Sequence, residues 1–289
     1  METRLKDAGD SQEKVCSRRK ARLDPPAFCC RAPLEVRGLR IGVGRPKLIA
    51  PTTSRTPEAL AADAARLAAM PEVDLIEVRL DALGRLSPEA HAAALKEAAA
   101  AAGRKPVLAT LRDKTEGGAF EADDAYYGAV CRAVIGLGAQ AGAALIDLEL
   151  FRDPSMTAAL VKAAHEAGLF VVISDHDFEG TPDEAEMFRR LCLEERLGAD
   201  ILKLAVMARG PEDALRLMSA TAAMRRAFTE KPLLTMAMGR WGVMTRLAGE
   251  AFGADLTFAS AGEASAPGQV PAGPCLAALE TLHHAMTQA

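Results

Sequence analysis

Short apolar runs alternate with alanine-rich helical patterns from about residue 47 to the end of the chain. The runs predict buried strands, and the longer stretches with apolar residues at helical spacing predict amphipathic helices. Eight strand–helix pairs of similar size favour an α/β fold, a closed parallel (β/α)8 TIM barrel, because a doubly wound sheet rarely has so many even units. We expect strands at residues 47–50, 74–80, 107–112, 144–150, 170–174, 201–206, 233–238 and 256–259. We expect helices near residues 58–69, 87–102, 121–136, 155–166, 182–197, 211–228, 242–252 and 274–287.

The remaining chain predicts two additions to this barrel. In residues 34–43, apolar and polar side chains alternate on both sides of Gly38, which is typical of a β-hairpin. Residues 1–33 carry many charges and the pair Pro25-Pro26 without any strand or helix period, and we expect a mostly disordered extension there. The total of 289 residues suits one barrel domain over residues 34–289 after that extension.

Composition excludes several classes of function. The net charge of −4 and an aromatic content of 4% supply neither the basic stripe nor the stacking platforms of a nucleic-acid-binding protein. Six scattered cysteines without a C-x-x-C pair indicate reduced thiols and a cytoplasmic protein without a zinc site. No run of 18 apolar residues predicts a membrane span, and no glycine-rich nucleotide motif follows a strand.

Strand alternation directs several charged residues into the expected barrel. In residues 74–80, Glu77 and Arg79 face inward if the aliphatic residues between them pack on helices. Both could contact a polar ligand, or they could form a buried ion pair that only fills the barrel. Asp147 and Glu149 share one face of their strand, and Arg112 ends the strand before it. These carboxylates could support cations in the barrel interior.

Lys203 interrupts the apolar run of residues 201–206 and points away from its helix-facing row. A charged amine inside an apolar strand is costly, so burial and nearby cations favour a neutral amine that could attack a carbonyl. The alternative is an ordinary lysine paired with Glu149 or Asp147. Both interpretations stay open at this point.

Other polar residues lie after the ends of the remaining expected strands. His176 follows the apolar run 170–174, where a strand would emerge at the catalytic end of a barrel. Glu116 lies on a loop beside two glycines and, taken alone, is typical of a solvated side chain. Arg246 lies near the start of an expected helix, which conflicts with the helix dipole unless an anion binds there. The loop 261–270 is rich in small residues and suggests a flap that carries Ser265 and Gln269.

Six motifs occur in order over residues 34–289, and together they resemble one family, the type I 3-dehydroquinate dehydratases. The motifs are L-R-D-K-T-E-G-G, I-D-L-E-L-F, S-D-H-D-F, I-L-K-L-A-V-M, T-R-L-A-G-E-x-F-G and A-S-A-P-G-Q. The resemblance implies a (β/α)8 barrel that converts 3-dehydroquinate into 3-dehydroshikimate and water, in the shikimate pathway of aromatic amino acid biosynthesis. The same reaction would also serve quinate catabolism. A homodimer without nucleic-acid or membrane partners is a further expectation from the family.

The resemblance also implies a role for each matching residue. Lys203 would form an imine with the substrate ketone, His176 would be the general acid and base, and Glu116 would orient that histidine. The iminium would supply the electrophile, so no metal or other cofactor is expected. The residues expected to contact substrate are Glu77, Arg79, Arg112, Arg246, Ser265, Gln269, Met236 and Phe258.

Two other functions were weighed against this one. A class I aldolase-type barrel also uses a lysine on its sixth strand but cleaves a carbon–carbon bond, and the pairing of Glu116 with His176 favours dehydration. A quinate- or shikimate-sensing regulator built on a decayed barrel would lack Lys203 or His176, and this chain has both.

Overall fold

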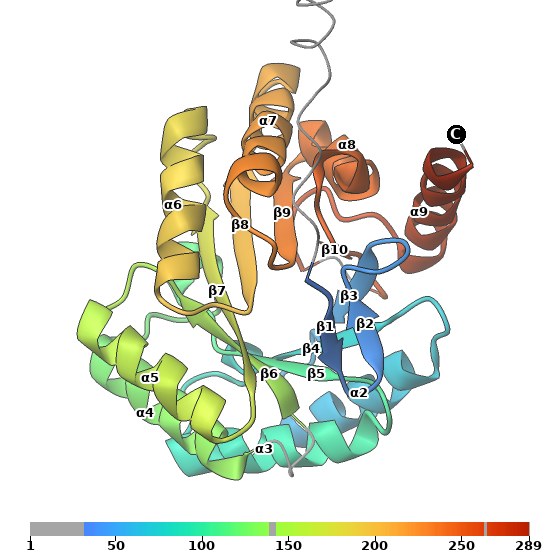
Figure 1. Cartoon of the computed structure of the whole chain (residues 1–289). Helices are drawn as coiled ribbons and strands as arrows, with labels where there is room; N and C mark the ends of the chain where they lie inside the picture. The colour runs from blue at the N-terminus through green and yellow to red at the C-terminus, as the bar shows by residue number, and fades with distance from the viewer. Residues whose placement is uncertain (1–31, 139–142, 263–264, 289) are drawn as a thin grey trace, which may run out of the picture.

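A computed structural model of the protein describes residues 32–138, 143–262 and 265–288. Within them, eight parallel strands form a nearly closed barrel, and Figure 1 shows the helices around its outside. The predicted TIM barrel is thus confirmed. The strands, in their order around the sheet, are β10 (Leu256–Phe258), β3 (Lys47–Pro51), β4 (Leu75–Arg79), β5 (Val107–Thr110), β6 (Ala143–Glu149), β7 (Phe170–Asp177), β8 (Ile201–Met207) and β9 (Leu233–Met238).

A helix follows each strand, and side-chain caps define where many of them begin. Thr56, Ser87, Asp123, Asp153 and Asp183 each accept a backbone N–H of the first helical turn. Such caps satisfy donors that the helix itself cannot pair. The long helices are α2 (Pro57–Ala69), α3 (Pro88–Ala101), α4 (Asp124–Leu137), α5 (Pro154–Glu166), α6 (Glu184–Arg196), α7 (Pro211–Ala227) and α9 (Ala272–Thr287).

The predicted N-terminal hairpin is present as β1 (Leu34–Val36) and β2 (Leu39–Ile41), paired antiparallel. Val36 and Ile41 are buried against residues from the beginnings of the barrel strands, including Leu75, Ile201 and Leu256. The hairpin therefore closes the N-terminal end of the barrel. Most of the predicted N-terminal extension, residues 1–31, lies outside the described residues.

The sheet order ends at β9 and β10, and this seam is held by a buried ion pair. The Arg225 guanidinium donates to the Asp255 carboxylate, and both side chains are buried. Asp255 in turn accepts the Leu233 N–H, while its own N–H donates to the Leu233 carbonyl. The pair thus links α7 to the ends of both seam strands.

The strand expected at residues 107–112 is shorter in the structure, since β5 ends at Thr110 and Arg112 lies beyond it, and two further elements differ from the prediction. The single helix expected at residues 242–252 is broken into η4 (Arg240–Gly242), α8 (Val243–Leu247) and η5 (Gly249–Phe252), so that prediction is wrong. Strand β7 continues three residues beyond the expected end and includes His176. Across residues 32–138, 143–262 and 265–288, no helix combines the length and apolar character that a membrane crossing requires.

Candidate active site

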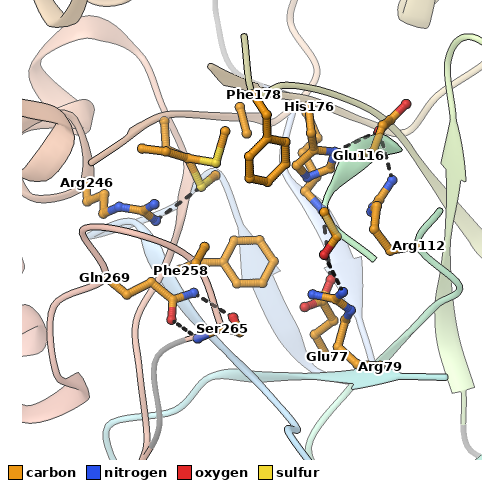
Figure 2. Close-up of a pocket in the computed structure, with 16 residues that line it drawn as sticks. Glu77, Arg79, Arg112, Glu116, His176, Phe178, Arg246, Phe258, Ser265 and Gln269 are labelled. Atoms are coloured by element: carbon orange, nitrogen blue, oxygen red, sulfur yellow. Dashed lines mark hydrogen bonds and ion pairs between the residues drawn. The ribbon is translucent and has the colours of Figure 1, made fainter. Parts of the chain in front are cut away.

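A pocket lies where the barrel strands end, which is the end of a barrel at which catalytic residues gather. All eleven residues that the sequence predicted for the site line it, together with five others (Figure 2). The sixteen lining residues are Glu77, Arg79, Arg112, Glu116, Gly117, His176, Phe178, Lys203, Ala205, Met236, Met238, Arg246, Phe258, Ser265, Ala266 and Gln269.

Strand alternation explains why charged residues from β4, β6 and β8 reach the barrel interior. On β8, Leu202 and Leu204 belong to the core between sheet and helices, whereas Lys203 lines the pocket. On β4, Ile76 and Val78 likewise face the helices. The predicted inward orientation of the charged residues is confirmed on both strands.

Lys203 is buried and ends beside two carboxylates. Its Nζ lies 2.9 Å from Asp147 Oδ2 and 3.9 Å from Glu77 Oε1, and 5.1 Å from the centre of the Phe258 ring. Two carboxylates thus lie next to the amine, and Lys203 forms a buried ion pair with Asp147. The pairing with Asp147 is one of the two interpretations of Lys203 that the sequence left open.

Arg112 organises the carboxylates on this side of the barrel. Its guanidinium donates to Asp147 at 2.6 Å, to Ser174 Oγ at 2.8 Å and to Glu149 at 3.3 Å. Burial opposes ionisation of Asp147, but the charges of Arg112 and Lys203 outweigh it and lower the pKa of Asp147 to about 2. Asp147 therefore remains an anion at neutral pH and faces the Lys203 amine.

His176 and Glu116 form a hydrogen-bonded pair, with His176 Nδ1 2.9 Å from Glu116 Oε2. Burial, followed by the charges of Arg112 and Lys203, lowers the pKa of His176 well below 6.5. Burial raises the pKa of Glu116 well above 4.5, even though Arg112 lies 3.2 Å away. The lowered pKa of His176 favours the neutral imidazole, whose second nitrogen, Nε2, is not engaged by Glu116.

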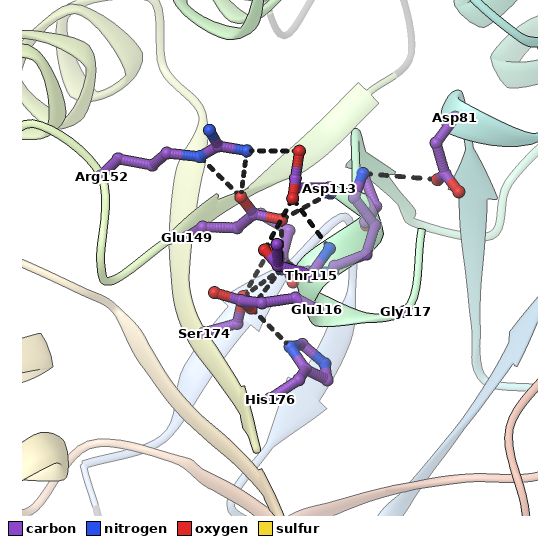
Figure 3. A network of polar contacts seen from close by, with 12 residues as sticks. Asp81, Asp113, Thr115, Glu116, Gly117, Glu149, Arg152, Ser174 and His176 are labelled. Carbon is purple, nitrogen blue, oxygen red and sulfur yellow. Dashed lines mark hydrogen bonds and ion pairs between the residues drawn. The ribbon is translucent and has the colours of Figure 1, made fainter. Parts of the chain in front are cut away.

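A second set of contacts holds the loop that carries Glu116, and Figure 3 shows it. Glu116 ends η2 (Lys114–Glu116), whose first turn is capped by Asp113. Glu149 accepts the Asp113 N–H at 2.8 Å and pairs with Arg152 at 2.7 Å, and Arg152 also lies 3.4 Å from Asp113. Sequence analysis did not single out Asp113 or Arg152, because only the fold brings them next to Glu149.

Arg79 lines the pocket but does not pair with Glu77, which was one of the two interpretations left open. It donates two hydrogen bonds to Asp81, both of 2.8 Å, while Glu77 accepts the Thr110 hydroxyl at 3.0 Å. Asp81 begins η1 (Asp81–Leu83), immediately after the strand. A carboxylate two residues after an inward arginine was visible in the sequence and could have predicted this pair.

Arg246 has an environment unlike that of Arg112. It is buried, and its guanidinium makes two long contacts, to Met236 Sδ and to the Pro267 carbonyl, both at 3.4 Å. Its Nε has no hydrogen-bond partner among the described residues. Burial without a carboxylate lowers the pKa of Arg246 to about 10. Within residues 32–138, 143–262 and 265–288, no carboxylate pairs with this guanidinium, although a buried cation requires an anion.

The reason given for Arg246 from the sequence was nevertheless wrong. Because α8 spans only Val243–Leu247, Arg246 lies in its last turn, where a cation agrees with the helix dipole. The argument for an anion at this place rests on the missing partner of the guanidinium and on its position in the pocket.

The loop that follows β10 folds over the same side of the pocket. Gln269 Nε2 donates to Ser265 Oγ and Gln269 Oε1 accepts the Ser265 N–H, both at 2.9 Å. Gly268 has φ +77°, and a side chain there would collide with the backbone of Gly239, which donates its N–H to Pro267. Figure 2 shows this pair and Arg246 across the pocket from His176 and Glu116.

Apolar side chains complete the lining. The predicted Met236 and Phe258 contribute from β9 and β10, and both are buried. Phe178 and Met238 were not predicted, although each lies two residues beyond an inward-facing residue, His176 and Met236, and the same alternation could have identified them. In the described part of the chain, no three His, Cys, Asp or Glu side chains gather as a candidate metal site.

Comparison with known proteins relates this site to one family. A family model described as type I 3-dehydroquinase matches residues 48–286. A 3-dehydroquinate dehydratase from Syntrophotalea carbinolica is 44% identical over 254 residues, which cover 87% of this chain and 98% of that protein. A catabolic 3-dehydroquinate dehydratase from Acinetobacter baylyi is 39% identical, with coverage of 81% and 85%.

Solved structures agree with these relatives. A type I 3-dehydroquinate dehydratase from Clostridium difficile, determined with covalently modified comenic acid, has a TM-score of 0.82 and 33% identity, covering 88% of this chain and 99% of that chain. A 3-hexulose-6-phosphate synthase from Salmonella typhimurium has a TM-score of 0.51 at 20% identity and shares the fold alone.

Proposed function

The chain belongs to the type I 3-dehydroquinase family and is a hydro-lyase, and we propose that it dehydrates 3-dehydroquinate through an imine on Lys203. One observation carries this proposal. A buried amine and a neutral imidazole line one pocket, and a buried guanidinium without a carboxylate partner lines it too. This arrangement suits a small ketone that carries a carboxylate.

Substrate binding begins at Arg246. A ligand carboxylate would supply the missing anion, and the planar guanidinium can grip it with two parallel hydrogen bonds. Ser265 and Gln269 cover the ligand from the flap, while Phe258 and Met236 pack against its ring. The remaining polar residues, Glu77, Arg79 and Arg112, border the space left for the hydroxyl groups.

Imine formation requires the Lys203 ammonium to lose a proton. Asp147 is a poor acceptor because its pKa is about 2, whereas the tautomer of neutral His176 that donates its Nδ1–H to Glu116 has a lone pair at Nε2. We assign the proton to His176. The free amine adds to the C3 carbonyl, and the imidazolium returns the proton to the carbinolamine hydroxyl, which leaves as water. The resulting iminium is positive and takes the place of the ammonium beside the Asp147 carboxylate.

The iminium then drives the elimination. It draws electrons from the neighbouring carbon, so neutral His176 can remove the C2 proton and leave an enamine. The enamine expels the C1 hydroxyl, which takes the same proton from His176 and departs as water. A further water molecule hydrolyses the product imine, which releases 3-dehydroshikimate and restores the lysine.

Glu116 serves this sequence by orienting His176 and by balancing its charge. Each time the imidazole gains a proton at Nε2, the Glu116 oxygen at Nδ1 can stabilise the cation. The contacts of Asp113, Glu149 and Arg152 keep that oxygen in place.

The alternatives from the sequence are less well supported. An aldolase would need a reacting carbon–carbon bond, and the likeness to a hexulose-phosphate synthase concerns the fold alone. A sensing regulator would have no use for the Lys203 and His176 arrangement. Cytoplasmic location, a homodimeric state and a biosynthetic rather than a catabolic role remain predictions from the family resemblance.

A direct assay separates dehydration from carbon–carbon cleavage. The purified protein is mixed with 3-dehydroquinate, and the ultraviolet absorbance of a conjugated enone is followed while the products are separated by chromatography. We expect 3-dehydroshikimate as the product. Unchanged substrate, or fragments with fewer carbon atoms, would contradict the proposal.

A further inference from the structure

Glu194 on α6 is buried directly behind Lys203 and is absent from the pocket lining. Its side chain is fully buried, and its Oε2 accepts the backbone N–H of Lys203 at 2.9 Å. Its Oε1 is buried and has no hydrogen-bond partner among the described residues. A side chain of α6 therefore accepts a hydrogen bond from β8 at Lys203, the residue that carries the amine.

A carboxyl group in this place needs an explanation. The other buried residues of α6 that face the sheet, Met187 and Leu191, are apolar, and an apolar side chain at position 194 would also fill space. Backbone N–H groups inside a sheet ordinarily donate to a neighbouring strand, so an acceptor from a helix is unusual. Burying a carboxyl without full hydrogen bonding is costly, which indicates that its contact with the strand matters.

The charge state of Glu194 suits a group behind a reacting amine. Burial, with a smaller contribution from Asp175, raises the pKa of Glu194 well above 4.5. The neutral acid can still accept the Lys203 N–H through its carbonyl oxygen. It adds no negative charge on this side of the lysine, where an anion would oppose deprotonation of the amine.

Two groups thus hold Lys203 from opposite sides. Asp147 binds the amine within the barrel at 2.9 Å, and Glu194 binds the backbone from outside at the same distance. During the reaction the amine must leave Asp147 and reach the substrate carbonyl. A fixed backbone limits the directions in which the flexible side chain can swing, and therefore favours the attacking geometry.

We propose that Glu194 is a positioning residue for the imine-forming lysine, acting through its hydrogen bond to the Lys203 backbone. This inference rests on the proposed imine mechanism. Glu194, which lies outside the pocket, would raise the rate of imine formation and have little effect on substrate binding.

The test compares three variants of the full chain. Glu194→Gln keeps a neutral acceptor oxygen, Glu194→Met keeps a similar size without an acceptor, and Glu195→Met is a matched control on the same helix turn. For each, steady-state kcat and KM are measured with 3-dehydroquinate, the rate of imine trapping by borohydride is measured in a single turnover, and circular dichroism checks folding.

We expect Glu194→Met to lower kcat and the trapping rate by roughly 10- to 100-fold, with KM changed by less than about twofold. Glu194→Gln and the control should stay within about twofold of the unaltered enzyme. A folded Glu194→Met variant with normal kcat would overturn the inference. So would a folded Glu194→Gln variant whose kcat falls by roughly 10-fold or more, and this second result does not depend on whether the methionine variant folds.

The same experiment separates this inference from the proposed function. If the unaltered enzyme turns over substrate without any trapped imine, the imine mechanism itself fails. If the unaltered enzyme is trapped normally and Glu194→Met is trapped equally fast, only the role of Glu194 is wrong.

Discussion

Replacing Arg246 with methionine should have opposite effects on stability and on activity. Arg246 is buried without a carboxylate partner, and its pKa falls from 12.5 to about 10 because burial disfavours the charge. Since one pKa unit corresponds to about 1.4 kcal/mol, the folded protein carries a cost of about 3 kcal/mol. The folded-state pKa is the lower one, so this cost is present at every pH below about 10.

The Arg246→Met variant removes that cost and retains much of the side-chain volume. We expect its melting temperature to rise by a few degrees, with about 10 °C as an upper limit for a relief of about 3 kcal/mol in a domain of this size. The substrate carboxylate loses its partner at the same time. Loss of a buried charge pair costs roughly 2–5 kcal/mol, so kcat/KM should fall about 30-fold to several-thousand-fold.

Arg225→Met is the matched control, because Arg225 is also a buried arginine but binds Asp255 away from the pocket. Breaking that ion pair should destabilise the protein by about 3–5 kcal/mol. Thermal unfolding followed by circular dichroism and steady-state kinetics with 3-dehydroquinate measure both effects. If Arg246→Met unfolds as readily as Arg225→Met while retaining full kcat/KM, the assignment of Arg246 as the carboxylate site is wrong.

Three further outcomes follow from the site. Because the pKa of His176 lies well below 6.5, kcat/KM should stay level as the pH falls to 6.5 and decline only below it. Arg79→Met removes one of the positive charges that lower this pKa, so it should move the decline to higher pH. A decline centred above pH 6.5 in the unaltered enzyme would contradict this. Asp147 has a depressed pKa of about 2, so it contributes about 2 kcal/mol to the free energy of unfolding above pH 3.8. This contribution is lost as the pH falls towards 2, and urea unfolding of Asp147→Asn should lack this dependence of stability on pH. Gln269→Ala should raise KM roughly 2- to 10-fold with kcat nearly unchanged, since both flap hydrogen bonds to Ser265 are lost, and an unchanged KM would exclude a role in binding.

Strand alternation predicted much of the site correctly, because the two faces of a barrel strand differ so strongly in polarity. Lys203 and Glu77 were each flanked by aliphatic residues, and that pattern alone directed them inward. Partners across the barrel were harder to predict. The sequence left Glu149 and Asp147 as alternative partners of Lys203 and did not pair Ser174 with Arg112, because the register between strands decides both contacts.

The errors have local physical causes. The helix expected at residues 242–252 is interrupted at Gly249 and ends before Gly253, whose φ of +102° favours glycine, and this break placed Arg246 at the end of a short helix. Glu194 was missed because a carboxylate on a helix surface is usually solvated, and only the packing of α6 against β8 buries it. The broken helix thus reflects local backbone conformation, whereas the burial of Glu194 reflects tertiary contacts that outweigh the local pattern.

Borohydride trapping followed by peptide mass mapping tests the central claim most directly. The enzyme is reduced during turnover of 3-dehydroquinate and digested, with Lys203→Ala treated in parallel. The imine mechanism predicts one added mass on the peptide that contains Lys203, loss of activity in step with that addition, and neither adduct nor appreciable turnover in the variant. Dehydration by Lys203→Ala, or an adduct on a different lysine of the active enzyme, would contradict it.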